Sequence, residues 1–92
     1  MEIIQLKAPD VKHALAQQVA AAVNAMRGMG LYKPPGVAET IDWATALGKL
    51  GETRLDEKTI AATLGAVLKY REDQERVAAQ GIEMIMAAVA DG

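Results

Sequence analysis

Three carboxylates lie close together in the stretch REDQER, residues 71–76. Glu72, Asp73 and Glu75 are of the type that serves in general acid–base catalysis. Arg71 precedes Glu75 by four residues, and Glu72 precedes Arg76 by the same interval, a spacing that pairs opposite charges along a helix. Nothing apolar surrounds the three carboxylates in a way that would raise a pKa. The pattern therefore predicts a solvated, charged helix surface rather than an acid–base site.

Metal and nucleophile chemistry have few residues to draw on. The chain contains one histidine, His13, and no cysteine, so the usual zinc spacings cannot be assembled. His13 falls on the polar side of its helical pattern, where an ordinary exposed side chain is expected. No nucleophile elbow, Walker-type glycine loop or dinucleotide fingerprint occurs. The sequence predicts that this chain, taken alone, is not an enzyme and holds no metal.

One segment could bind an anion. A helix that begins near Gly36 and Val37 would present free backbone N–H groups of the kind that bind phosphate, and Lys33 stands just before it. The alternative is that Pro34-Pro35-Gly36 only stiffens a turn. The residues alone favour this alternative, because such N-termini are a general consequence of helix geometry.

The composition indicates one small all-α domain. Of the 92 residues, 51% are hydrophobic but only 3% are aromatic, so the interior is built from Ala, Val, Leu, Ile and Met. These side chains suit close helix–helix packing, and no strand-like alternation is present. The net charge of −2 and the lack of a basic cluster argue against a nucleic-acid partner. No apolar run is long enough to span a membrane and no signal peptide is evident, so we expect a cytoplasmic location.

A first helix is expected over residues 11–27. Its apolar face contains Val11, Leu15, Val19, Ala22, Val23 and Met26, and its polar face His13, Gln17, Asn24 and Arg27. Gly28 is expected to end it in a left-handed cap. Upstream, Ile3, Ile4 and Leu6 look like the tail of an amphipathic segment, interrupted by Ala8-Pro9-Asp10 with Asp10 as an N-cap. This abrupt start suggests a truncated chain.

The segment 33–51 is expected to contain the central helix, which starts at about Pro35 or Gly36 and closes on Gly51. Two groups of apolar residues fall on nearly opposite sides of it: Val37, Ile41, Ala44 and Gly48 on one, and Trp43, Leu47 and Leu50 on the other. A helix that is apolar on most of its circumference must be enclosed by neighbours. The pattern therefore predicts burial of this helix on both sides, with Trp43 in the core.

Two further helical stretches follow. Leu55 and Asp56 resemble a hydrophobic staple and an N-cap. The helix after them is expected to bury Ile60, Leu64, Val67 and Leu68 and to expose Lys58 and Lys69. Whether the chain bends near Tyr70 is left open by the pattern. A last apolar stripe contains Val77, Gly81, Met84, Ile85 and Ala88, with Ile82 and Val89 at its margin.

Two blocks of this sequence resemble the C-terminal lid region of MoxR-type AAA+ ATPases. They are KPPGVAETIDWATAL and, after a turn, LDEKTIAATLGAVLKYREDQERV. The preceding EIIQLKAPDV and ALAQQVAAAVNAMR are similar to the run that leads into this region. The resemblance covers residues 2–77, whereas residues 78–92 form an additional helical segment of unknown role.

The resemblance implies a bundle of four to five helices that closes over ATP and Mg²⁺ bound mainly by a large α/β domain. That domain, which carries the Walker motifs and the arginine finger, is absent from this chain. The chain itself would then hold no cofactor and would not be catalytic alone. The implied partners are the large domain, neighbouring subunits of a ring and, often in this family, a von Willebrand A-domain protein. The implied role is chaperone-like maturation of a partner enzyme.

The resemblance also implies a nucleotide-facing edge at Lys33, Gly36 and Val37. In the family, an arginine near the start of this helix reads the γ-phosphate, but residues 35–39 here contain none. Lys33 is the nearest cation, and a lysine reads a phosphate less well than a bidentate arginine. The alternative function is a stand-alone helical module for protein–protein interaction or self-association, indicated by the first apolar segment and by the Met- and Ala-rich last stripe. A third possibility is that the last helix covers a surface that the large domain would otherwise cover.

Overall fold

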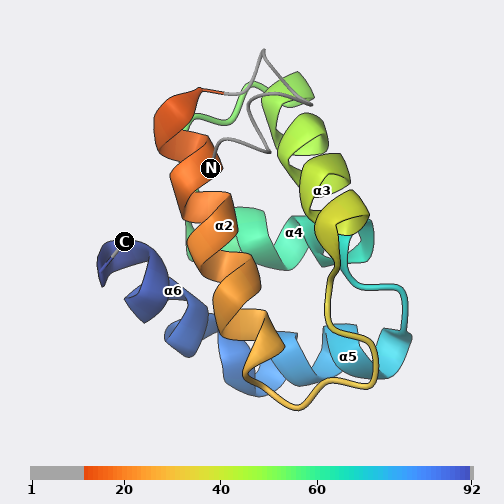
Figure 1. The fold of residues 1–92 in the computed structure, drawn as a ribbon. Helices are drawn as coiled ribbons and strands as arrows, with labels where there is room; N and C mark the ends of the chain where they lie inside the picture. The colour runs from red at the N-terminus through yellow and green to blue at the C-terminus, as the bar shows by residue number, and fades with distance from the viewer. Residues whose placement is uncertain (1–11, 92) are drawn as a thin grey trace.

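The fold was analysed in a computed structural model, which describes residues 12–91 of the chain. The elements, in order, are α2 (His13–Arg27), α3 (Val37–Lys49), α4 (Glu57–Val67), α5 (Arg71–Arg76), the π-helix η1 (Val77–Gly81) and α6 (Ile82–Asp91). Residues 12–91 contain no strand, and the predicted all-α helical bundle is confirmed (Figure 1). None of the helices in this range is long and apolar enough to cross a membrane. The apolar segment expected at residues 3–6, the cap at Asp10 and Val11 lie outside the described residues.

Helix α2 buries the face that the spacing predicts. Leu15, Val19, Ala22, Val23 and Met26 are all buried, as is Ala16 beside them, whereas the four expected polar residues are exposed. The expected left-handed cap at Gly28 is wrong, because Gly28 has φ −88°. The left-handed residue is Gly30, with φ +70°. The helix is thus followed by one more turn before the chain reverses direction.

Helix α3 is not enclosed, and the prediction of a central helix buried on both sides is wrong. Only one face is buried, with Thr40, Trp43, Ala44 and Leu47, and this face packs chiefly on α4 and α2. Val37 is 55% exposed and Leu50 is 65% exposed. A small bundle has too few helices to cover both sides of α3, so part of each predicted apolar side, Val37 on one and Leu50 on the other, remains at the surface.

Gly51 ends α3 as the sequence predicts. Its φ of +78° is the left-handed conformation, which costs a residue with a Cβ atom free energy. The Glu52 N–H donates to the Leu47 carbonyl at 3.0 Å, and the Gly51 N–H donates to the Gly48 carbonyl at 3.1 Å. This pair of bonds is the Schellman motif, which satisfies carbonyls at a helix end.

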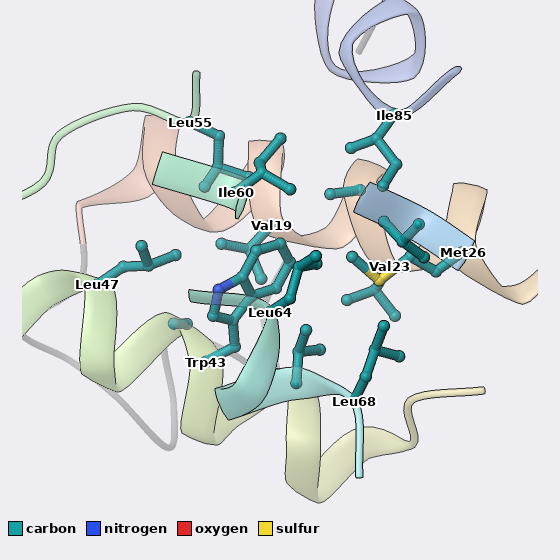
Figure 2. Close-up of a cluster of buried hydrophobic side chains, with 14 of the residues drawn as sticks. Val19, Val23, Met26, Trp43, Leu47, Leu55, Ile60, Leu64, Leu68 and Ile85 are labelled. Atoms are coloured by element: carbon teal, nitrogen blue, oxygen red, sulfur yellow. The ribbon is translucent and has the colours of Figure 1, made fainter. Parts of the chain in front are cut away.

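Helix α4 begins at the predicted N-cap. The Asp56 Oδ1 accepts the Thr59 N–H at 2.7 Å, and Leu55, just before the cap, is buried together with Ile60 (Figure 2). The Leu55 N–H also donates to Gln18 Oε1 at 2.6 Å, which fixes the approach to α4 against α2. The four residues expected inward on α4 are buried, and Lys58 and Lys69 are exposed, as predicted.

The chain bends between α4 and α5. Leu68 and Tyr70 are extended, and the Gln74 side-chain amide donates to the Leu68 carbonyl at 2.9 Å across the bend. From Arg71 the chain is helical without interruption to Asp91, through α5, η1 and α6. We call this run the C-terminal arm. Helix α6, the last part of the arm, packs against α2 and α4 (Figure 1).

The arm buries most of the predicted last stripe but not all of it. Val77, Gly81 and Ile85 are buried, and Ile82, Ala88 and Val89 are half-buried. Met84 is 57% exposed, so its predicted place in the stripe is wrong, and Met86 packs against the core instead. The wider π-turn at η1 rotates the residues that follow it, so a spacing of 3.6 residues carried through this segment assigns the wrong methionine.

Trp43 lies in the middle of the core. Figure 2 shows its indole among side chains of α2 and α4, and none of its surface is exposed. The indole N–H donates to Thr63 Oγ1 at 2.8 Å, and the Thr63 hydroxyl donates to the Thr59 carbonyl at 2.7 Å. The predicted burial of Trp43 is confirmed, and its polar atom is satisfied within the core.

Candidate functional site

The three predicted site residues lie at the junction of the 28–36 loop with α3. Lys33 is an exposed residue of the loop, Gly36 is the N-cap of α3, and Val37 is its first residue. The loop is drawn in orange to yellow in Figure 1 and runs beside α5. The structure therefore places these residues together at one end of the molecule, where three elements meet.

Asp73 anchors this loop from the first turn of α5. Its Oδ1 accepts the Tyr32 N–H and its Oδ2 accepts the Lys33 N–H, both at 2.9 Å, across 41 and 40 residues of sequence. The side chain of Asp73 is buried, with 1% of the residue exposed. The prediction that Asp73 belongs to a solvated charged face is therefore wrong. Both of its oxygens bond to backbone amides, and this offsets the cost of removing the carboxylate from water.

Arg27 holds the other end of the loop. Its Nε donates to the Pro35 carbonyl at 3.1 Å, from the last residue of α2. Leu31, just before the Asp73 anchor, and Pro35, at the Arg27 anchor, are both buried. The loop is consequently fixed by α2, by α5 and by its own apolar side chains.

The first turn of α3 is capped by its own glutamate. The Gly36 N–H donates to Glu39 Oε1 at 2.9 Å, the return half of a capping box, and the Thr40 hydroxyl donates to the Gly36 carbonyl at 2.7 Å. Glu39 Oε2 lies 3.9 Å from Lys69 Nζ. The Gly36 hydrogen bond, followed by the charges of Lys69 and Lys33, lowers the pKa of Glu39 below its usual value.

This arrangement does not suit a phosphate at Gly36. The carboxylate of Glu39 already accepts the Gly36 N–H, one of the amides that an anion at this helix start would use, and its negative charge would repel the anion. Lys33 contributes its backbone N–H to Asp73, which leaves only its side chain for a ligand. The assignment of Lys33, Gly36 and Val37 to a nucleotide-facing edge stays a prediction.

The surface around the anchored loop is apolar and cationic. Tyr32 is 78% exposed, and Val37 and Tyr70 are exposed as well. Lys33 and Pro34 lie between Tyr32 and Val37 in sequence, and both are exposed. We call these five residues the loop edge. Two aromatic rings, a valine, a proline and one lysine on a rigid support suit contact with another protein surface better than chemistry on a small molecule.

The remaining described surface includes His13 and an open groove. Within residues 12–91, no group of three or more His, Cys, Asp or Glu residues could hold a metal ion. His13 is exposed, as predicted. An open groove of about 710 Å³ runs between the start of α4 and the region of η1. Its walls include Lys58, Ala61, Ala78 and Glu83.

Comparisons with protein-family models, with curated proteins and with solved structures found no match to this chain. Sequence reasoning missed three residues that build the loop edge's support. Glu39 could have been found, because a glutamate three residues after an N-cap is a capping-box signal. Asp73 and Arg27 carry no local signal, since their partners are identified only once the chain has folded.

Proposed function

We propose that this chain is the C-terminal lid domain of a MoxR-type AAA+ ATPase and that it docks on the large ATPase domain through the loop edge. The observation that carries the proposal is the anchoring of the 28–36 loop. The KPPGVAE block that holds the resemblance is the segment that Asp73 and Arg27 hold in place. Two independent anchors on one exposed loop are expected where the loop must keep a fixed shape for a partner.

The proposed lid acts by position and not by direct phosphate binding. Glu39 already occupies the Gly36 amide, and no arginine stands in the first turn of α3. Tyr32 and Val37 would supply apolar contact area, and Lys33 would supply a charge that pairs with an acidic side chain at the rim. Closure over ATP and Mg²⁺ would then follow from docking of the whole lid on the large domain. The proposed downstream role is chaperone-like maturation of a partner enzyme within a ring of subunits, with a von Willebrand A-domain protein as a further candidate partner.

Docking in trans tests this proposal. The gene sequence upstream of the Met1 codon and in the neighbouring genes identifies the large domain to be used. That domain is purified without its own lid and titrated with this chain, with and without a slowly hydrolysed ATP analogue. We expect nucleotide-dependent binding and background ATPase activity for this chain alone. Lack of binding in both conditions, or turnover by the isolated chain, would contradict the proposal.

Two substitutions at opposite ends of α3 sharpen the test. Val37→Glu places a charge on the loop edge, whereas Leu50→Glu places the same charge at an exposed position of the other end. Loss of an apolar contact at a docking surface commonly costs more than about 1 kcal/mol, which is roughly a fivefold to tenfold weaker affinity. We expect Val37→Glu to weaken docking by this amount or more and Leu50→Glu to leave it unchanged.

The second candidate function is self-association through the C-terminal arm. It is supported by the exposure of Met84 on α6 and by the exposed alanines Ala87 and Ala90 on the same helix. Light scattering over a range of concentrations distinguishes the two functions. A dimer that Met84→Glu converts to a monomer would favour self-association, whereas a monomer at all concentrations would exclude it.

A further inference from the structure

The C-terminal arm contacts the 28–36 loop at two separate points. Asp73, at the start of the arm, accepts the Tyr32 and Lys33 amides. Gly81, at the end of η1, lies against Met29, since a Cβ atom at Gly81 would come 3.0 Å from the Met29 sulfur and 3.2 Å from its terminal methyl carbon. The two contact points lie on one uninterrupted helical run.

The arm is itself fixed to the bundle at its far end. Ile85 on α6 is fully buried, and α6 packs on α2 and α4. Val77 of η1 is buried too. Packed interiors shift between discrete arrangements and do not deform gradually. A shift of α6 along this continuous helical run would therefore reach Asp73 at the arm's start.

We propose that Asp73 is a positioning residue that couples the C-terminal arm to the loop edge, so that a ligand or protein which moves the arm changes the shape of that edge. The coupling itself rests only on the contacts above. Its effect on docking rests on the function proposed for this chain. Both oxygens of the Asp73 carboxylate bond to the loop, so a displaced Asp73 would displace the Tyr32 and Lys33 amides with it.

The alternative interpretation of Asp73 is purely structural. In that case its loss would destabilise the whole bundle, and no particular amide would respond more than another. The neighbouring side chain offers a contrast. Gln74 bonds to the Leu68 carbonyl and so fixes the α4–α5 bend instead of the loop. Substitution of Asp73 therefore removes the hydrogen bonds to the loop, whereas substitution of Gln74 removes the hydrogen bond at the bend.

Amide hydrogen exchange on the full chain, resolved by NMR, tests the coupling. Asp73→Asn keeps the side-chain shape but replaces one acceptor oxygen by an NH₂ donor, so at least one of the two loop amides loses its partner. We expect exchange at Tyr32 and Lys33 to become about tenfold faster or more, given the usual contribution of a hydrogen bond to a charged group. Amides within α2, α3 and α4 should keep their protection. Glu75→Gln, an exposed carboxylate of α5, is the matched control and should change neither set.

A second variant tests the coupling without touching the carboxylate. Gly81→Ala pushes on the Met29 side chain from within η1. We expect the amide resonances of Tyr32 and Lys33 to shift, whereas Gly65→Ala, an exposed glycine of α4 with space for a methyl group, should leave them in place. The proposal is overturned if Asp73→Asn leaves the two loop amides as protected as before, or accelerates all amides equally, or if Gly81→Ala leaves the loop resonances unmoved.

The docking assay separates this inference from the proposed function. If the wild-type chain docks and Asp73→Asn docks at least about tenfold more weakly with the bundle intact, both are supported. If the wild-type chain does not dock but the exchange result holds, the coupling stands and the lid function fails. If the variant docks as the wild type does while its loop amides exchange faster, the coupling has no role in docking.

Discussion

At the scale of single residues, the polar atoms inside this bundle each have a specific partner. Within residues 12–91, no buried side-chain nitrogen or oxygen lacks a hydrogen bond. Trp43 with Thr63, and Asp73 with the loop amides, are two such cases. Because the two pairs join segments far apart in sequence, they select one arrangement of the helices in addition to the packing of apolar side chains.

Trp43→Ala should destabilise the domain by about 3–5 kcal/mol, because it removes a fully buried ring and leaves a cavity. This loss is a large part of the total free energy of unfolding of a typical small domain, which is roughly 5–15 kcal/mol. Urea denaturation followed by circular dichroism measures the change, since the variant has no tryptophan fluorescence. Leu50→Ala, at an exposed position of the same helix, is the control and should fall within about 0.5 kcal/mol of the wild type. A near-zero change for Trp43→Ala would show that the core is placed wrongly.

Glu39 makes stability depend on pH in the acid range. Its pKa in the folded state is lowered from 4.5, so the unfolded chain binds more protons than the folded chain as the pH falls through this region. The contribution of the Glu39 carboxylate to the free energy of unfolding is fully present above its pKa in the unfolded chain. It is lost as the pH falls through the pKa of Glu39 in the folded protein. We expect Glu39→Gln to lower the urea midpoint at pH 7 and to lower it less at pH 3.

The acid sensitivity should not vanish in Glu39→Gln. The pKa of Asp56 is also lowered, by the Thr59 amide and hydroxyl at the start of α4. This shift too makes the folded protein less stable as the pH falls. Denaturation curves of both proteins at a series of pH values separate the two carboxylates. An equal difference between wild type and variant at pH 7 and pH 3 would show that Glu39 does not prefer its ionised form in the folded protein.

At the scale of helices and turns, the two glycines Gly51 and Gly65 have opposite requirements. Gly51 needs its positive φ to form the Schellman motif after α3. Gly65 lies exposed within α4, where an added methyl group meets nothing within 4 Å. Gly51→Ala should therefore destabilise the domain by about 1–2 kcal/mol. Gly65→Ala should stabilise it by roughly 0.5–1 kcal/mol.

Thermal or urea denaturation of the two alanine variants measures this difference directly. Both substitutions add one methyl group at a surface glycine, so each is the control for the other. Effects of the same sign would contradict the structure, since of these two glycines it places Gly51 and not Gly65 in the left-handed region.

The helices themselves were predictable because their signals are local. The spacing of apolar residues found the buried faces of α2 and α4, and Asp56 marked the start of α4. The burial of α3 was overestimated because spacing shows which sides of a helix are apolar but not how many neighbours exist to cover them. Met84 was misplaced because η1 changes the period within the arm. Both errors arise from tertiary context that no short window contains.

The support of the candidate site was harder to predict than the fold. The sequence indicated Lys33, Gly36 and Val37, but the residue that fixes their loop is Asp73, some 40 residues later. Its neighbours in sequence are charged and suggest a hydrated surface. The burial of Asp73 follows only from two backbone amides that come next to it when the bundle folds. Their position depends on the packing of α2 and the arm.

At the scale of the whole molecule, the C-terminal arm is part of the fold and not an addition to it. Residues 78–92 were expected to be a segment of unknown role outside the resemblance. In the structure, α6 packs on α2 and α4, and Ile85 completes the buried cluster. The arm thus closes the side of the core that α3 does not cover (Figure 1). This accounts for how a chain with so few aromatic residues buries one continuous core.

Deletion of residues 78–92 should accordingly disrupt the domain. Removal of Ile85 alone is comparable to a truncation of a buried isoleucine, which costs about 2–5 kcal/mol, and the deletion also uncovers apolar side chains of α2 and α4. Met84→Gln in the full chain changes an exposed residue of the same arm and should shift stability by no more than about 0.5 kcal/mol. Circular dichroism and light scattering are the measurements. We expect the deleted chain to lose its sharp unfolding transition or to associate through the uncovered surface. A deleted chain that stays monomeric, helical and cooperative would show that α2, α3 and α4 form a sufficient core, and that the arm is needed only to hold the loop edge.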